Sequence, residues 1–260
     1  MSGSVLVPSV KSADRALSLI EFVANRGNVS FNEILGGLSL PRSSAHGLLQ
    51  TLVASGWLDH DQQTKRYTLG LRTWQVGQLY TVHRDLARAA TPIMDKLALQ
   101  LGETVQLAVL DGIENVYVAI SDSPNPMRLA SSVGMRLHAH ATGIGKALLS
   151  LIDPAEAEAR LRAVVLPKLT DRTVTDVDDI LALLHAARIT GFALDDEEFI
   201  DGCRCVAVPL TSLGSAGVTS ALSVTMPTTR TDAEWPQSIF GPLHSSADEI
   251  RRVLGAHFPA

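Results

Sequence analysis

The chain contains 260 residues, of which 46% are hydrophobic and 19% are charged, and its formal net charge is −5 at pH 7. This length is enough for two domains, each with its own hydrophobic core. No apolar run reaches transmembrane length, and the first residues lack the basic-then-apolar order of a secretory signal. The two cysteines, Cys203 and Cys205, are too close in sequence to staple a fold, which is usual in a reducing compartment. We therefore expect a cytoplasmic protein with no membrane partner.

Residues 30–69 have the order of a winged helix-turn-helix, which is a DNA-binding module. A short helix is expected to open at Ser30, whose hydroxyl can cap it while Glu33 completes a capping box. A second helix is expected from Pro41, a favourable first-turn residue, to Gly56, which can serve as its C-cap. Its apolar positions have helical spacing and form one buried stripe. This stripe consists of Ala45, Leu48, Leu49, Leu52 and Val53.

A hairpin is expected to follow this second helix. Residues 57–60 and 66–69 have the pattern of two short strands around a polar loop, and Lys65 and Arg66 lie where the loop meets the second strand. In such a wing, the two cations would meet DNA phosphates, which fix register and supply affinity.

A third helix is expected over residues 12–25, with Ser12 and Asp14 as its caps. The charge is divided unevenly along the chain. Residues 1–80 carry seven Lys/Arg against five Asp/Glu, a balance of +2, whereas residues 81–260 carry fifteen against twenty-two, a balance of −7. The positive excess therefore lies with the DNA module. Because it is small, we expect modest affinity for each module and a need for dimerisation.

The second helix of the module is the one expected to approach the bases. The face opposite its apolar stripe carries small or hydrogen-bonding side chains, which allow close contact with base edges. The expected partner is double-stranded DNA. The residues expected to contact the DNA, the two wing cations included, are Arg42, Ser43, Ser44, His46, Gln50, Lys65 and Arg66.

The domains are expected to span residues 1–70, a linker helix over residues 71–90, and a second domain over residues 91–260. Apolar side chains in this connecting segment, such as Trp74 and Leu79, exceed what a free linker would need. The segment is therefore a candidate dimer surface. The alternative is that these side chains pack only on their own domain.

The second domain has the pattern of an α+β fold, because short links between strands favour an antiparallel sheet with helices packed on it. Strands are expected at residues 105–110, 116–120, 127–131, 192–195, 206–211 and 216–225. Helices are expected at residues 143–151, 155–164, 177–190 and 235–254.

Three stretches carry a more specific signal. Residues 40–52 contain the turn and recognition helix, residues 133–149 contain the run Thr-Gly-Ile-Gly-Lys, and residues 191–209 contain the run Asp-Asp-Glu-Glu. Through these stretches the chain resembles the IclR-type (isocitrate lyase regulator) transcription factors over nearly its whole length. The resemblance implies an N-terminal winged helix-turn-helix, a linker helix and a C-terminal GAF-like domain that binds a small effector.

The resemblance also implies a function. It predicts a ligand-responsive transcriptional regulator rather than an enzyme, without a cofactor, that binds operator DNA as a homodimer or homotetramer. One departure affects the DNA contacts, since the family often has Arg where this chain has Gly47. Glycine there costs ~1 kcal/mol of helix propensity relative to alanine and removes one contact. Reading of the operator should therefore depend more on the neighbouring side chains, which are Arg42, Ser43, Ser44, His46 and Gln50.

The expected effector is a small organic acid. Glycines at a helix start expose backbone N–H groups to which the helix dipole attracts an anion, so the start near Gly143 suits a carboxylate. The resemblance implies that the ligand lies between this helix start, the acidic strand end, a cysteine and two hydroxyls on a later strand. Carried over by motif, the effector-binding residues are Leu129, Leu137, Gly143, Ile144, Asp195, Cys205, Ser223 and Thr225.

Several of these residues also have a purely structural interpretation. Gly143 and Gly145 could serve only a tight turn, Asp195 could cap nearby amides, and Cys205 could be a small buried hydrophobe. Ser223 and Thr225 share one sheet face, where inward hydroxyls need partners.

Other chemistries are disfavoured. Two cysteines and two histidines could bind a metal, but they lack an established spacing of four ligands, and a Cys203–Cys205 disulfide would be strained. The trio His244, Ser245 and Asp248 has the pattern of a polar helix face. Two rival functions stay open: an enzyme with a DNA-binding appendage, and an architectural DNA-binding protein whose second domain only dimerises.

Overall fold

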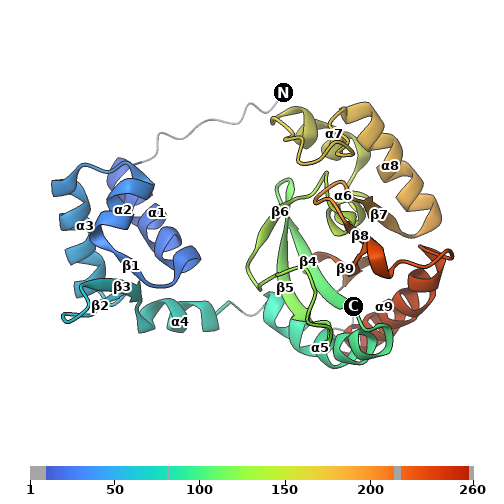
Figure 1. Cartoon of the computed structure of the whole chain (residues 1–260), viewed down its shortest axis with the longest axis horizontal. Helices are drawn as coiled ribbons and strands as arrows, with labels where there is room; N and C mark the ends of the chain where they lie inside the picture. The colour runs from blue at the N-terminus through green and yellow to red at the C-terminus, as the bar shows by residue number, and fades with distance from the viewer. Residues whose placement is uncertain (1–9, 81, 214–217, 258–260) are drawn as a thin grey trace. The chain divides into compact units, whose positions relative to one another are not determined.

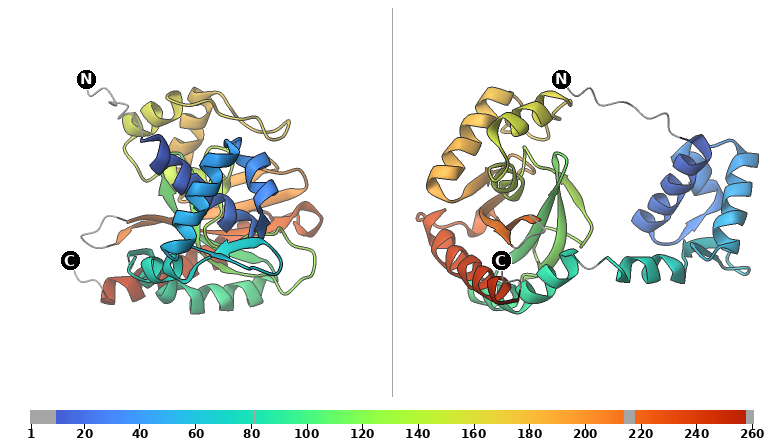
Figure 2. Two further views of the ribbon diagram at one scale, coloured as in Figure 1. Left: turned by 90° about the vertical axis from the view of Figure 1, so that its left-hand side faces the viewer. Right: turned by 180° about the vertical axis from the view of Figure 1, so that it is seen from behind.

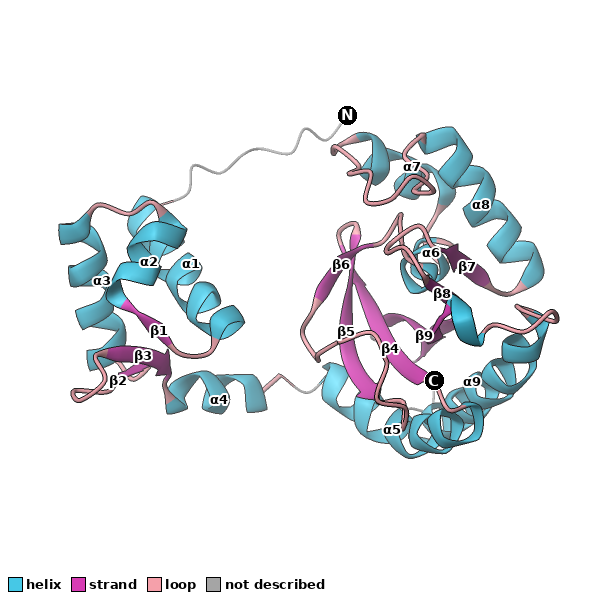
Figure 3. Cartoon of the chain, in the orientation of Figure 1, coloured by secondary structure: helices cyan, strands magenta, loops and turns pink. Residues whose placement is uncertain are grey.

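The computed structural model describes residues 10–80, 82–213 and 218–257, and the chain divides into two compact units, residues 1–81 and 82–260. Each unit has its own hydrophobic core and its own antiparallel sheet (Figure 1). The first unit is a winged helix-turn-helix, and the second is a curled antiparallel sheet with helices on both faces, as expected from the sequence (Figure 3).

The first unit contains three helices, a three-stranded sheet and a fourth helix at its end. Residues from all three helices and from the hairpin meet in one core, which includes Leu19, Ile34, Leu49 and Leu58. The sheet has the order β1-β3-β2. The elements are α1 (Lys11–Arg26), β1 (Val29–Ser30), α2 (Phe31–Leu38), α3 (Arg42–Ala54), β2 (Leu58–His60), β3 (Arg66–Leu69) and α4 (Leu71–Gln78).

The capping box of α2 is confirmed. The N–H of Ser30 donates to the Glu33 carboxylate over 2.7 Å, and the N–H of Glu33 donates back to the Ser30 hydroxyl over 3.3 Å. The caps expected for the first helix are wrong. Because the N–H groups of residues 13 and 14 already bond to the Val10 carbonyl, α1 opens at Lys11 and places Ser12 and Asp14 inside its first turn.

The second helix differs from its predicted bounds by one residue at each end. Pro41 is the N-cap of α3 rather than its first residue, and Ser55 is the C-cap, followed by Gly56 at φ +76°. The apolar stripe faces the core as predicted, with Ala45, Leu49 and Leu52 buried.

The connecting segment, expected as a linker helix over residues 71–90, consists of α4 and the start of α5 (Val82–Leu101). Leu79 and Tyr80, which follow α4, are not part of a helix. From Leu86 onward α5 buries an apolar stripe in the core of the second unit, which includes Ala90 and Met94. The boundary therefore falls at residue 81, because the sheet of the second unit holds α5 along most of its length.

The second unit contains a six-stranded sheet with the order β6-β5-β4-β9-β8-β7, in which every neighbouring pair is antiparallel. The four longest strands, β5, β4, β9 and β8, form the middle of the sheet, and the short strands β6 and β7 form its edges. The strands are β4 (Thr104–Asp111), β5 (Glu114–Ser121), β6 (Arg136–His138), β7 (Ala193–Asp196), β8 (Cys203–Leu213) and β9 (Val218–Pro227). Residues 216 and 217 of the last expected strand lie outside the described residues.

The strand expected at residues 127–131 is wrong. The chain runs there as a loop and rejoins the sheet only at β6. The Met127 carbonyl accepts a hydrogen bond of 3.0 Å from the guanidinium of Arg230, a side chain about a hundred residues away in the sequence. The alternating sequence alone could not reveal this, since alternation does not supply a hydrogen-bonding partner.

Helices cover the two faces of the sheet differently. On one face lie α5 and the C-terminal helix α9 (Gln237–His257), which pack against each other (Figure 2). On the other face lies the short helix α6 (Gly143–Leu149), with α7 (Pro154–Arg162) and α8 (Val177–Thr190) outside it. The turn η1 (Thr228–Arg230) precedes α9.

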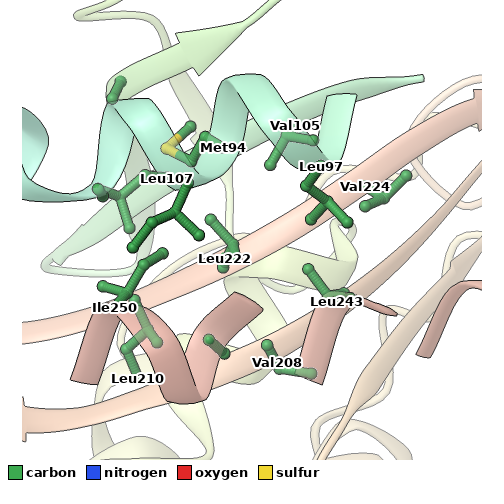
Figure 4. Close-up of a cluster of buried hydrophobic side chains, with 14 of the residues drawn as sticks. Met94, Leu97, Val105, Leu107, Val208, Leu210, Leu222, Val224, Leu243 and Ile250 are labelled. Atoms are coloured by element: carbon green, nitrogen blue, oxygen red, sulfur yellow. The ribbon is translucent and has the colours of Figure 1, made fainter. Parts of the chain in front are cut away.

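Side-chain size follows this division. The face toward α5 and α9 carries large apolar residues, among them Leu107, Val208 and Leu222 (Figure 4). The face toward α6 carries small or polar residues, which are Gln106, Ala108, Cys205, Ala207, Ala221 and Ser223. Small side chains allow α6 to approach the strands closely. A Cβ added at Gly145 would lie 2.2 Å from the Cα of Ala139, so only glycine fits there.

Candidate functional site

The first candidate site is the exposed face of α3 in the winged helix-turn-helix. Ser43, His46, Gly47 and Gln50 are exposed, opposite the buried stripe. A Cβ at Gly47 would contact nothing within 4 Å. The structure thus presents most of the predicted base-reading residues on one open helix face, where they can form hydrogen bonds.

Several of the predicted DNA contacts have neighbours within the unit. The Arg42 guanidinium carbon lies 5.2 Å from the centre of the Phe31 ring. Ser44 is half-buried, and its hydroxyl accepts a hydrogen bond of 3.4 Å from the Arg15 side chain on α1. Ser44 therefore lies at the side of α3 that faces α1, apart from Ser43 and Gln50.

The two wing cations have different surroundings. The loop before β3 is ordered by Asp61, whose carboxylate accepts from the N–H groups of Gln63 and Thr64 over 2.7 and 3.2 Å. These hydrogen bonds lower the pKa of Asp61. Lys65 is exposed at the end of this loop, at φ 56°.

Arg66 is half-buried and tied to its own unit. Its guanidinium donates to the side chain and the carbonyl of Asn28 over 2.9 and 2.7 Å, and to the Glu33 carboxylate over 3.2 Å. These bonds join the wing to the turn after α1 and to the capping box of α2. Arg66 therefore holds the wing in place, whereas Lys65 projects from it.

The second candidate site is a cluster of buried polar groups on the sheet face beneath α6. Strand register brings several predicted residues together, because Asp195 pairs with Cys205 and Cys205 pairs with Thr225. Ser223 lies two residues before Thr225 on the same face, where it pairs with Gln106 of β4. Residues from four strands thus meet under one helix.

Asp195 is the acid of this cluster. It is 6% exposed, and its carboxylate accepts from the N–H groups of Glu198 and Phe199 over 2.7 and 3.2 Å. Burial raises the pKa of Asp195 to about 6, although the nearby Lys146 ammonium and the two hydrogen bonds oppose this shift. The carboxyl group of Asp195 therefore titrates closer to neutral pH than an exposed aspartate does.

Lys146 of α6 and Glu198 form a buried ion pair beside Asp195. Their side chains are 3% and 12% exposed. One carboxylate oxygen of Glu198 bonds to the ammonium, and the other is buried with no partner among the described residues. The sequence interpretation did not single out either residue as functional, although Lys146 follows the two glycines that it did consider.

Cys205 and Tyr117 add weakly acidic groups. Burial raises the pKa of Cys205 to about 12, with the Asp195 charge adding to the shift and bonds to Ser223 and Thr225 opposing it. The thiol therefore stays protonated, as expected of a small buried side chain. Tyr117 is 4% exposed, and burial, together with Cys205 and Asp195, raises its pKa as well.

Gln106 joins the hydroxyls of β9. Its side-chain oxygen accepts from Ser223 and from Thr225, each over 3.1 Å, and its side-chain nitrogen is buried with no partner among the described residues. A buried amide nitrogen without an acceptor is unfavourable by about 1–3 kcal/mol. Sequence reasoning overlooked Gln106, although an amide inside the apolar run of residues 105–110 was a usable signal.

The helix start above the cluster is closely packed. Thr142 caps α6, because its hydroxyl accepts from the N–H of Gly145 over 3.1 Å and donates to Asn115 over 2.8 Å. A Cβ at Gly143 would lie 3.1 Å from the Cys205 sulfur. Ile144 is buried on α6, and Leu137 packs beside it, half-buried. Leu129 is in the loop before β6 and is also half-buried.

Two further properties concern the described part of the chain. Within it, no group of three or more His, Cys, Asp or Glu side chains is placed to hold a metal ion. None of the helices formed by these residues has the length and apolarity needed to cross a membrane.

Comparison with known proteins agrees with this architecture. A family model described as "Bacterial transcriptional regulator IclR C-terminal" matches residues 78–252, and one described as "IclR helix-turn-helix domain" matches residues 12–62. The transcriptional regulator KdgR of Escherichia coli K12 is 29% identical over 96% of this chain and 94% of its own length. The regulator XynR of the same organism is 31% identical over 98% of this chain and all of its own.

A solved structure is similar throughout. The IclR homolog from Microbacterium hydrocarbonoxydans, crystallised in complex with 4-hydroxybenzoate, has a TM-score of 0.82 and 25% identity. The match covers 94% of this chain and 99% of that one. The relatives are regulators and not enzymes, so the enzyme alternative is set aside. With its helix-turn-helix DNA-binding domain and its C-terminal ligand-binding domain, the chain belongs to the IclR family of bacterial transcriptional regulators.

Proposed function

We propose that the C-terminal domain binds a small organic acid on the sheet face beneath α6, and that binding changes the affinity of the protein for its operator. The observation that carries this proposal is the Gln106 side-chain nitrogen, which is buried among polar groups and has no acceptor among the residues that the structure describes. A ligand carboxylate would supply that acceptor. Buried polar groups in folded proteins are nearly always hydrogen-bonded, so one without a partner is a natural ligand contact.

The polar groups around Gln106 suit a carboxylate. In its protonated form Asp195 can donate a hydrogen bond, and the Cys205 thiol stays uncharged and therefore does not repel an anion. In this proposal, the effector contacts Gln106, Asp195 and Cys205, with further contacts from Gly143, Ile144, Ser223 and Thr225 and apolar walls from Leu129 and Leu137.

The start of α6 contributes less to anion binding in this proposal than its sequence indicated. Since α6 has only seven residues and Thr142 already takes the N–H of Gly145, we assign the anion chiefly to the side chains of the sheet. The Microbacterium homolog supports the ligand class, because 4-hydroxybenzoate is a small carboxylate. We use that compound as a chemical probe of the class.

For the DNA, we propose that the start of α3 reads bases and that Lys65 contacts a phosphate. Two copies of the chain would present two recognition helices to half-sites about one helical turn, ~34 Å, apart. We therefore propose a homodimer or a homotetramer. Its place of action is the cytoplasm, where bacterial operators are.

The effector proposal is tested by thermal denaturation of the full chain with small carboxylates, each compared with its neutral amide. The first pair is 4-hydroxybenzoate and 4-hydroxybenzamide. A carboxylate that binds the native state raises the melting temperature, in proportion to RT ln(1 + [L]/Kd). We expect this rise in the wild type, and none in Gln106→Met. The control Gln100→Met alters an exposed glutamine on α5 and should respond as the wild type does.

Coupling to DNA is tested by fluorescence anisotropy on the intergenic duplex upstream of the protein's own gene. A true effector must change DNA affinity by the same factor by which DNA changes effector affinity. If Gln106→Met responds to carboxylates as strongly as the wild type, the proposed binding face is wrong. If carboxylates that bind leave DNA affinity unchanged, the second domain is a ligand-binding module without regulatory coupling.

A further inference from the structure

The ring of Phe31 lies against two side chains at the start of α3. The Arg42 guanidinium carbon is 5.2 Å from the ring centre, and the His46 ring is 6.3 Å away and nearly perpendicular, at 88°. Arg42 and His46 are four residues apart, so they lie on the same face of the helix, one turn from each other. Phe31 itself is the first residue of the preceding helix, α2.

The position of Phe31 is fixed from two sides. The residue before it, Ser30, forms the capping box with Glu33 and so fixes the backbone at the start of α2. The half-buried ring of Phe31 packs against the core of the winged helix-turn-helix. Phe31 is therefore a rigid support, whereas Arg42 and His46 are exposed.

This support has a consequence for recognition. A free arginine side chain occupies many rotamers and loses conformational entropy when one of them is selected. A guanidinium that already lies over an aromatic ring has lost part of that freedom, and it keeps its N–H donors because a cation–π contact does not use them as hydrogen bonds. Preorganisation of this kind increases affinity by reducing what binding must immobilise.

We infer that Phe31 is a positioning residue for DNA recognition, which sets the orientation of Arg42 and His46 and thereby contributes to sequence specificity without contacting a base. This inference rests on the proposed role of these two residues in reading DNA. The effect should be specific to base preference, because Phe31 does not change the charge that the protein presents to phosphates.

The test begins with a preferred duplex, selected from a random library by the full-length wild-type protein. Anisotropy then measures affinity for this duplex and for a scrambled one. For Phe31→Leu we expect roughly twofold to fivefold weaker binding to the preferred duplex, the size of an exposed cation–π contact, and little change on the scrambled duplex. Phe31→Trp retains an aromatic face and should keep the preference.

Two controls separate positioning from stability. Phe22→Leu removes a half-buried ring from the same core, and the cation over that ring is Arg26, which lies on α1. It should leave the ratio of the two affinities unchanged. In an Arg42→Ala/His46→Ala background, Phe31→Leu should cause no further loss of preference, because the side chains that it positions are absent.

The outcomes are distinguishable. If Phe31→Leu weakens binding to both duplexes equally, or weakens it as much in the doubly substituted background, Phe31 only packs in the core and the inference is overturned. Tighter binding by Phe31→Leu would also overturn it, since the ring would then hold Arg42 away from DNA. If Arg42→Ala/His46→Ala by itself leaves base preference unchanged, the proposed reading by α3 fails instead.

Discussion

Lys146 and Glu198 form an ion pair that is almost completely enclosed between α6 and the segment after β7. Two charges of opposite sign can remain buried only while each compensates the other, so the loss of one leaves the other unpaired. This pair lies beside Asp195, where it helps to determine the electrostatics of the candidate effector site.

The first prediction is that Lys146→Met destabilises the C-terminal domain by about 3–5 kcal/mol, the usual effect of removing one partner of a buried pair. The double variant Lys146→Met/Glu198→Met should recover most of that loss, because no buried charge is left. Urea denaturation of the full chain, followed by circular dichroism, measures the unfolding free energies. Equal stability of the single and the double variant would show that the pair is not electrostatically coupled.

The second prediction concerns Asp195 and pH. Its pKa is about 6 in the folded protein, against a usual value of 3.8, so the folded state holds its proton more tightly than the unfolded state. Stability is therefore lost as pH rises from about 4 to about 6, and a penalty of about 3 kcal/mol persists above that range.

Asp195→Asn removes this penalty and keeps a side-chain oxygen for the N–H groups of Glu198 and Phe199. The variant should be more stable than the wild type at pH 7 and no more stable at pH 4. Denaturation at a series of pH values gives the difference between the two proteins directly. A difference that is constant with pH would mean that Asp195 does not titrate in this range.

The third prediction contrasts two helical glycines. Gly145→Ala should destabilise the protein severely, because its Cβ would meet the backbone of Ala139 at 2.2 Å and α6 would have to move away. Gly47→Ala has open space around it and should stabilise α3 by about 1 kcal/mol through helix propensity. Melting temperatures of the two variants should shift in opposite directions. A neutral Gly145→Ala variant would contradict the close packing of α6.

Features with a complete local signal were predictable from the sequence. The capping box of α2 needs only Ser30 and Glu33, and the ends of α8 were predicted at Val177 and Thr190, as found. The Asp176 side chain caps the start of that helix, and Gly191 ends it at φ 79°. Such signals are local because donors, acceptors and the required backbone angle all lie within a few residues of each other.

Features that depend on distant partners were not predictable. The alternation over residues 127–131 resembled that of a strand, but the carbonyl of Met127 accepts its hydrogen bond from the Arg230 side chain. In the same way, the role of Gln106 emerges only when β4 pairs with β9 and places its amide beside Ser223 and Thr225. The motif indicated that Cys205, Ser223 and Thr225 lie close together, and the pairing of β8 with β9 places them on neighbouring strands.

The last prediction separates the two wing cations, which adjoin in sequence but differ in surroundings. Lys65→Gln removes an exposed charge without changing the backbone requirement at φ 56°, because both residues carry a Cβ. If Lys65 contacts one phosphate, the slope of log affinity against log salt should become shallower by about 0.9, and binding to all duplexes should weaken similarly. The melting temperature should not change.

Arg66→Gln should behave in the opposite way. Its guanidinium joins β3 to Asn28 and Glu33, so its loss should lower the melting temperature of the winged helix-turn-helix. The salt slope should change less than in Lys65→Gln, because the Arg66 charge is already engaged. A salt series by anisotropy and a thermal melt of each variant give both quantities. An Arg66→Gln variant with an unchanged melting temperature and a slope shallower by about 0.9 would make Arg66 the phosphate contact, and the wing would then bind DNA through β3 instead of through the loop before it.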